Sequence, residues 1–152
     1  MKAAIFRAGD IVVGDFPEPK PAAGQVLVKT LACGICGSDL HAAQHAPRMV
    51  EMSKRVSGRI PMDLSRDVVF GHEFCCEVLD YGPDTDRRMK PGARAVAMPV
   101  MPLSAETRTT IGYSNDYPGG YAERMVLAAP LLLDVPNGLP ADHAALTEPL
   151  AV

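Results

Sequence analysis

The sequence predicts a mainly β protein with short helices, and three observations support this fold class. Glycine and proline supply 27 of the 152 residues (13 and 14), about 18% where about 12% is usual, as expected of short strands joined by tight turns. Apolar residues make up 47% and charged residues 22%, the balance of a globular chain. Short runs of β-type residues recur between turn signals, and 152 residues suit one domain with a hydrophobic core.

The first half of the chain is predicted to open as a meander of strands. Its β-type runs, bounded by glycine and proline, cover residues 3–7, 11–16 and 25–32. A short helix is expected within CGSDLHAAQH, with Ser38 or Asp39 as its N-cap, which places Cys36 at the helix entrance. Residues 46–66 show no clear period, so we predict a loop or an insertion with a short helix.

The second half continues the alternation of strands and turns. VVFGHEFCCEVLDYG predicts a bent strand or a strand pair near a bulge, because β-branched and aromatic residues surround one glycine. RMKPGARAVAMPV predicts a turn at Pro91-Gly92 and another strand. Residues 101–117 show no convincing pattern, whereas YPGGYAERMVLAAP and LLLDVP restore turn and strand signals. NGLPADHAALTEPLAV predicts a turn at Asn137 and a helix of one or two turns.

Charge and hydropathy exclude several classes of protein. The formal net charge is −3 and no lysine/arginine cluster is present, so we expect no nucleic-acid partner. The opening MKAAIFRAGDIVVGDF meets charged and turn residues before a long apolar stretch develops. We therefore expect neither a signal peptide nor a membrane span, and a cytoplasmic location. Four cysteines without a secretory signal indicate thiols or metal ligands rather than a disulfide framework.

The Cys33-Gly-Ile-Cys36 segment has two readings that use both cysteines. As a thioredoxin-like redox pair it follows a strand and opens a helix, but no clear βαβ unit surrounds it. A low thiol pKa at Cys33 would support this reading. As half of a four-cysteine zinc knuckle it fits poorly, because the only other cysteines are the adjacent Cys75 and Cys76.

A third reading draws one metal ligand from each of several places. Cys36 at the helix entrance, His72 in GHE and a carboxylate from elsewhere would give three protein ligands and one open position, as catalytic zinc prefers. Taken alone, His72 is a strand histidine with a hydrogen-bond partner and Cys36 a small buried hydrophobe. Their neighbours decide between these interpretations.

The segments GICGSDLH, GHEF, PGARAVAMP, GGYAERMVL and TEPLAV carry a specific resemblance. They occur in the order seen in zinc-dependent medium-chain alcohol and polyol dehydrogenases, in particular the sorbitol dehydrogenase-like branch. Residues 1–152 resemble the N-terminal, GroES-like zinc-binding catalytic domain of that family. The resemblance implies a partly open β-barrel and an enzyme that oxidises an alcohol or polyol to a ketone or aldehyde by hydride transfer to NAD or NADP.

By this resemblance, Cys36, His72 and Glu148 are ligands of the catalytic zinc; on sequence alone, Glu148 is also compatible with a surface charge at a helix end. Glu73 is a close neighbour of the metal, and we count it as a further, weaker ligand and a candidate catalytic residue. Neighbouring residues of a regular strand face opposite sides, so His72 and Glu73 can approach one metal only where the strand ends or bulges. Gly71 provides for such a bend.

The same resemblance assigns the residues that follow Cys36. Ser38 and His41 form a proton relay from the bound alcohol to solvent, and Asp39 orients a ligand from behind. Alternative readings are an N-cap for Ser38 and a solvent-facing histidine for His41. Cys33 is expected only to pack.

Two departures from the family pattern shape the expectations. The lobe MPVMPLSAETRTTIGYSNDYPGG lacks the four cysteines that bind a structural zinc in many relatives, so we expect one catalytic zinc and no structural zinc. Residues 46–66 exceed the corresponding loop of typical relatives, where it borders the substrate cleft.

The 152 residues also hold no G-x-G-x-x-G fingerprint. We expect the Rossmann domain that holds NAD(P), and that usually forms the homo-oligomer, to be missing from a truncated product or single domain. Hydride transfer needs the nicotinamide held against the alcohol, so we expect this chain alone to be inactive. The alternative is a stand-alone GroES-like metal-binding or interaction module without catalysis.

Overall fold

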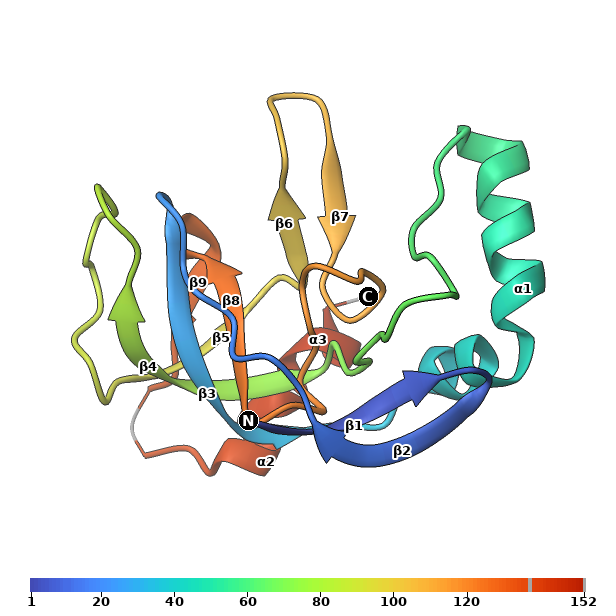
Figure 1. The fold of residues 1–152 in the computed structure, drawn as a ribbon. Helices are drawn as coiled ribbons and strands as arrows, with labels where there is room; N and C mark the ends of the chain where they lie inside the picture. The colour runs from blue at the N-terminus through green and yellow to red at the C-terminus, as the bar shows by residue number, and fades with distance from the viewer. Residues whose placement is uncertain (137, 152) are drawn as a thin grey trace.

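The structure, a computed structural model that describes residues 1–136 and 138–151, is built around three antiparallel sheets (Figure 1). The largest has the strand order β8-β3-β4-β5-β9. Its strands are β3 (Gln25–Cys33), β4 (Phe74–Tyr81), β5 (Arg94–Ala97), β8 (Arg124–Ala128) and β9 (Leu132–Asp134). Strands β8 and β9 lie at opposite ends of this order, so the sheet does not close into a barrel. The predicted mainly β class is confirmed, with the barrel left open.

The central strands alternate between the core and the opposite face. Val26 and Val28 on β3 and Val78 on β4 are fully buried, each worth about 1.5–3 kcal/mol of hydrophobic stabilisation. The β3–β4 register shifts twice, between Leu27/Val28 and between Thr30/Ala32. Such bulges bend a strand, and the second shift lies just before the CGIC segment.

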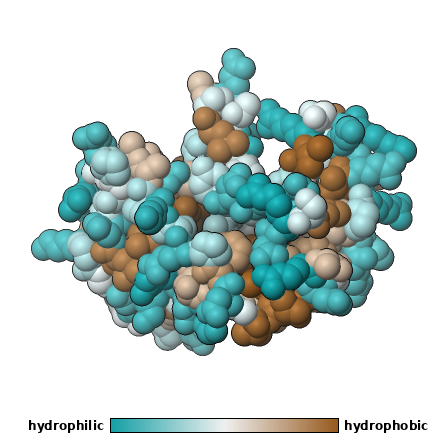
Figure 2. Space-filling model, in the orientation of Figure 1, coloured by the Kyte–Doolittle hydropathy of each residue, from teal (hydrophilic) through white to brown (hydrophobic). Residues whose placement is uncertain are grey.

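A hairpin of β1 (Lys2–Arg7) and β2 (Asp10–Asp15) lies across one end of the molecule. Both strands agree with the predicted runs to within one residue at each end. β1 buries Ile5 and Phe6, whereas Ile11 and Val13 on β2 are 50% and 83% exposed. Figure 2 shows an apolar patch over this hairpin on an otherwise mostly hydrophilic face.

Helix α1 (Gly37–Ser57) begins earlier than the sequence predicted. Its N-cap is Cys36, in an extended conformation (φ −79°, ψ 147°), and the Cys36 carbonyl accepts the backbone N–H of Asp39 at 3.1 Å. The prediction of Ser38 or Asp39 as N-cap was therefore wrong. Both residues lie in the first helical turn, where their side chains remain available to a site.

The same helix also continues further than predicted, which corrects the loop expected over residues 46–66. It is kinked at His45 (φ −130°, ψ 25°), and Pro47 lies just beyond the kink, where a missing N–H costs little. Gly58, at φ 69°, ends it by donating to the Lys54 carbonyl at 3.0 Å. Residues 58–66 contain no helix or strand. The helix resumes after one irregular residue, His45, and Pro47 lies near the start of its second segment.

A second hairpin occupies the lobe for which the sequence showed no pattern. Strands β6 (Val100–Pro102) and β7 (Arg108–Thr110) project from the body of the molecule (Figure 1). Three residues are too few to display an alternation. The connecting turn is tied by Ser104, whose hydroxyl accepts the backbone N–H of Thr107 at 3.1 Å.

Short helices complete the described chain: η1 (Ala129–Leu131), α2 (Ala141–Ala145) and α3 (Thr147–Leu150). The helix expected after Pro140 is confirmed as α2 and α3, whereas the turn expected at Asn137 lies outside the described residues. Ala144 and Ala145 of α2 pack on Cys75 and Val96 of the sheet. None of the helices in the described ranges is both long and apolar enough to cross a bilayer.

The bend predicted at Gly71 is present, with φ +97°. Substitution of this glycine tests the close packing around it. A Cβ atom at this position would lie 2.7 Å from the Tyr121 ring and 2.9 Å from Cys33 Sγ. Gly9 has the same φ of +97° but open space around it. We expect Gly9→Ala to cost about 1–2 kcal/mol for the left-handed backbone, and Gly71→Ala a further ~1–3 kcal/mol for overpacking. Urea unfolding of both variants measures the difference, and equal losses would contradict this packing.

Candidate metal centre

Three potential metal ligands from two chain segments meet at one point: Cys36, His72 and Glu73. Their ligand atoms all lie within 4.8 Å of one another. Cys36 is the N-cap of α1, and the other two precede β4, where the chain is not yet a regular strand. His72 and Glu73 are each only 8% exposed. The bend at Gly71 thus lets two consecutive side chains approach the same point, as predicted.

Gly34 allows the CGIC segment to pack closely against Glu73. Its backbone N–H donates to the Glu73 carbonyl at 2.7 Å, and a methyl group at Gly34 would overlap the Glu73 carboxylate. Only a residue without a side chain lets the two segments come this close. The same contact holds the backbone before Cys36 against the backbone after His72.

Asp39 lies behind His72 and is the most deeply buried charged residue of the centre, at 3% exposure. Its Oδ1 is 3.3 Å from His72 Nδ1, close enough for an ion pair. The N–H direction does not meet hydrogen-bond geometry, so among the described residues Nδ1 is a buried polar atom without a hydrogen-bond partner. The contact between Asp39 and His72 is therefore electrostatic, and it leaves His72 Nδ1 without a hydrogen bond among the described residues.

Burial and charge act in opposite directions on the titrating groups of the centre. Burial would raise the pKa of Asp39, but the contacts from His72 and Tyr121 outweigh it, and the pKa lies below its usual value. The Asp39 carboxylate in turn raises the pKa of His72 to about 9 against the opposing effect of burial. Burial raises the pKa of Tyr113 and Tyr121, which remain hydrogen-bond donors.

The chemistry of these side chains fits a zinc ion. Thiolate, imidazole and carboxylate are the ligands that zinc takes, at bond lengths of about 2.0–2.3 Å. Donors within 4.8 Å of one another can share one ion after a small movement of their side chains. His72 Nδ1 faces Asp39, so Nε2, which lies 3.4 Å from Ser38 Oγ, is the nitrogen left for a metal. Cys36, His72 and Glu73 would hold the metal.

The other predicted site residues lie at different distances from this point. Ser38 Oγ belongs to the centre through His72 Nε2 and through the Tyr113 hydroxyl at 2.9 Å. His41 is exposed and its ring lies 6.0 Å from that of His45, edge to face. The relay role of these two residues remains a prediction.

Glu148 is not among the three residues whose ligand atoms converge. It lies on α3 and lines a cavity of about 250 Å³ together with Phe74 and Met98. Phe74 directly follows Glu73 in the chain, but none of Cys36, His72 and Glu73 lines this cavity. The assignment of Glu148 as a zinc ligand therefore remains a prediction.

Cys33 packs inside the fold next to the centre. Its Sγ would be 2.5 Å from a Cβ atom at Gly120 and 2.9 Å from one at Gly71, so the thiol fills the space beside two glycines. Burial, followed by the charge of Asp39, raises its pKa to about 12. A redox thiol needs the opposite shift, so the structure offers the redox reading no support.

Tyr113 and Tyr121 belong to the centre although the sequence singled out neither. The Tyr121 hydroxyl donates to Asp39 Oδ2 at 2.8 Å, and that of Tyr113 lies 3.0 Å from Asp39 Oδ1. Both stand in glycine-rich segments that look like turns. A buried tyrosine hydroxyl usually finds a hydrogen-bond partner. A tyrosine within a turn segment was therefore the one signal in the sequence that could have indicated a polar contact here.

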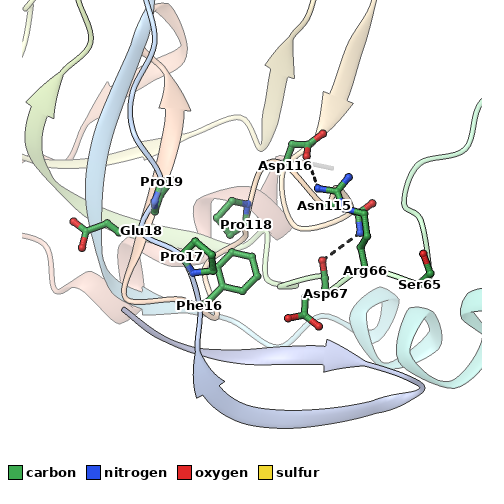
Figure 3. Close-up of a pocket in the computed structure, with 10 residues that line it drawn as sticks. All are labelled: Phe16, Pro17, Glu18, Pro19, Ser65, Arg66, Asp67, Asn115, Asp116 and Pro118. Atoms are coloured by element: carbon green, nitrogen blue, oxygen red, sulfur yellow. Dashed lines mark hydrogen bonds and ion pairs between the residues drawn. The ribbon is translucent and has the colours of Figure 1, made fainter.

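A surface groove with a volume of about 520 Å³ lies elsewhere (Figure 3). Its charged side chains Arg66, Asp116 and Asp67 are already paired. Arg66 pairs with Asp116 at 2.8 Å, and Asp67 pairs with Arg7 at 2.6 Å. None of the three metal-ligand candidates lines it, so its size does not mark it as the reactive site.

Gly34→Ala tests the approach of the two segments. The added methyl overlaps the end of a flexible side chain, so Glu73 is expected to turn away while the fold persists. We expect zinc affinity about tenfold or more weaker, the scale of losses for groups that support metal ligands. Gly37→Ala is the matched control, since no atom lies within 4 Å of its added Cβ. Competition titration with a chelator measures both, and equal affinities would disprove the role of the contact.

The raised pKa of His72 predicts a pH-dependent affinity. Below about pH 9 the metal-free imidazole carries a proton that zinc must displace, so affinity rises with pH, by about tenfold per unit from this group. Asp39→Asn removes the charge that raises this pKa towards 9 from its ordinary 6.5. Between these values, we expect the variant to release about one proton less on binding zinc. Identical slopes of log affinity against pH would contradict the coupling.

Comparison with known proteins places this centre in a family. Residues 22–137 match the alcohol dehydrogenase GroES-like domain. (R,R)-butanediol dehydrogenase of Bacillus subtilis is 32% identical, over the whole of this chain and 45% of its own length. Sorbitol dehydrogenase of Gallus gallus is 28% identical, over the whole chain and 42% of its own length.

A solved structure agrees in fold. A protein of Sinorhizobium meliloti described as a zinc-binding dehydrogenase, bound to NADP, has a TM-score of 0.76 and 30% identity, over 99% of this chain and 42% of its own. The chain thus spans less than half the length of these relatives. The match over most of its residues, joined to a Cys36, His72 and Glu73 centre, shows that the chain belongs to the GroES-like domain family of zinc-type alcohol and polyol dehydrogenases.

Proposed function

We propose that the chain is the zinc-binding catalytic domain of an NAD(P)-dependent dehydrogenase that converts an alcohol or polyol to a ketone or aldehyde. The observation that carries the proposal is the convergence of Cys36, His72 and Glu73 in front of the buried Asp39. The named activities of the relatives, butanediol and sorbitol dehydrogenase, support the substrate class.

The proposed ligand set is Cys36, His72 and Glu148, with Glu73 as a further, weaker ligand. Glu148 is included because TEPLAV resembles the segment that supplies a carboxylate ligand in the sorbitol dehydrogenase-like branch. One zinc is proposed per chain, because the β6–β7 lobe contains no cysteine in the printed sequence. When bound, zinc supplies a Lewis acid that lowers the pKa of an alcohol hydroxyl.

The protein's own groups would then handle the proton. Asp39 holds His72 through the 3.3 Å contact and fixes its orientation. Ser38 would take the proton of the alcohol, a role supported by its Oγ lying 3.4 Å from His72 Nε2. His41 stands three residues further along α1, hence on the same face of the helix, and is exposed, so it can pass the proton to water.

The hydride acceptor is proposed to be NAD or NADP held by a Rossmann domain of the functional enzyme. The 152 residues contain no dinucleotide fingerprint, and hydride transfer needs the nicotinamide fixed against the alcohol carbon. We therefore propose that the 152-residue chain alone is inactive and that the functional enzyme is a homo-oligomer formed through the Rossmann domain.

Zinc binding by ligand variants tests the proposal. The wild-type chain should bind one zinc, Cys36→Ala and His72→Ala should each bind about 100-fold or more weakly, and the double variant not at all. Glu148→Gln should lose about tenfold. Cys33→Ser is the matched cysteine control, because it nearly keeps the volume of the side chain and its contact with the Gly34 carbonyl, and it should bind close to wild type. Metal analysis and chelator competition provide the readout, and a wild type without zinc, or a double variant that retains it, would refute the proposal.

A further inference from the structure

We propose that Tyr113 and Tyr121 are positioning residues whose hydroxyls hold the Asp39 carboxylate against His72 and thereby set the affinity of the centre for zinc. The inference rests on the proposed function of the Cys36 and His72 centre. It assigns a role to two side chains that would not touch the metal themselves.

The Asp39 carboxylate has one tyrosine on each oxygen. Tyr121 donates to Oδ2 at 2.8 Å, and the Tyr113 hydroxyl lies 3.0 Å from Oδ1, the oxygen that faces His72. A carboxylate at 3% exposure needs such donors, because water is excluded and an uncompensated buried charge is costly. The two hydroxyls therefore determine where the negative charge lies.

Tyr121 joins the two segments that carry the ligands. Its backbone N–H donates to the Phe70 carbonyl at 3.1 Å, two residues before His72. Its hydroxyl lies 3.1 Å from the Gly34 carbonyl, two residues before Cys36. The phenol has one proton to donate, and the charged carboxylate is the stronger acceptor. Tyr121 thus anchors Asp39 at the point where the segments meet.

Tyr113 contacts both His72 and Asp39. Its ring centroid is 5.5 Å from that of His72 and 5.7 Å from that of Phe70, while its hydroxyl also lies 2.9 Å from Ser38 Oγ. One side chain therefore packs at a tilt of 42° beside the imidazole and also reaches the carboxylate behind it. Such a contact restricts both the rotation of the ring and the position of Asp39.

The loop that carries Tyr113 is fastened independently of the centre. Asn115 accepts the backbone N–H of Asp63 at 2.7 Å and donates to the Asp63 carbonyl at 3.0 Å. The backbone N–H of Ile111 donates to the Pro99 carbonyl at 2.9 Å. The tyrosine is thus held in place before any metal binds, as a positioning role requires.

Removal of each hydroxyl tests the role. Tyr113→Phe and Tyr121→Phe keep the rings and should each weaken zinc binding by about 10- to 100-fold, as losses behind a ligating histidine do. Tyr117→Phe is the control from the same loop, because Tyr117 packs its ring on the main core cluster. Chelator competition gives the affinities, and thermal unfolding without zinc shows that each variant is folded.

A double-mutant cycle separates positioning from general stability. In an Asp39→Ala chain, or Asp39→Asn if the alanine variant does not fold, the tyrosine substitutions should change zinc affinity by less than about twofold. The absorption spectrum of bound Co²⁺ should change in the single tyrosine variants and not in Tyr117→Phe.

Three results would overturn the inference. Folded Tyr113→Phe and Tyr121→Phe chains could bind zinc within twofold of wild type. Alternatively, the tyrosine substitutions could weaken zinc binding by the same factor in the Asp39→Ala chain as in the wild-type chain. In both cases the positioning role fails while the zinc centre stands, provided that Cys36→Ala and His72→Ala lose the metal. A wild-type chain that binds no zinc would remove the proposed function and the inference together.

Discussion

The close packing of backbone around Gly71 is the constraint on which the rest of the structure depends. Its carbonyl accepts the N–H of Gly120, and Cβ atoms at Gly112 and Gly119 would meet the same carbonyl. Cys33 fills the remaining space with its thiol. Three distant segments can come this close only where side chains are missing, and the positive φ of Gly71 then turns His72 and Glu73 towards Cys36.

Electrostatic compensation follows from this packing. Asp39 and Glu73 are two buried carboxylates beside one histidine, and burial of charge without compensation is unfavourable. In the metal-free chain the proton on His72 and the tyrosine hydroxyls offset Asp39. A divalent cation would supply positive charge to the same group, so metal affinity and the arrangement of donors behind the ligands are linked.

The errors of the sequence-based predictions have identifiable causes. Strands with buried alternate positions, such as β3, were predicted within one residue, because a period of two is visible in nine residues. The three-residue strands β6 and β7 are too short for that signal. Residues 46–66 showed no clear period, although a second helical segment begins after the kink at His45, with Pro47 near its start. Tyr113 and Tyr121 were missed because glycine neighbours mark them as turn residues.

The sequence by itself determined the fold class, the candidate ligands Cys36 and His72, and the need for a bend at Gly71, since these depend on residue type and local spacing. Only the tertiary structure decided that the ligand atoms of Cys36, His72 and Glu73 lie within 4.8 Å of one another while Glu148 stands apart, and that two tyrosines from a distant loop hold the buried Asp39. The contacts of Asp39 with His72 and Tyr121 join residues 33 and 82 positions apart in the chain, and no local periodicity records which distant side chains will meet.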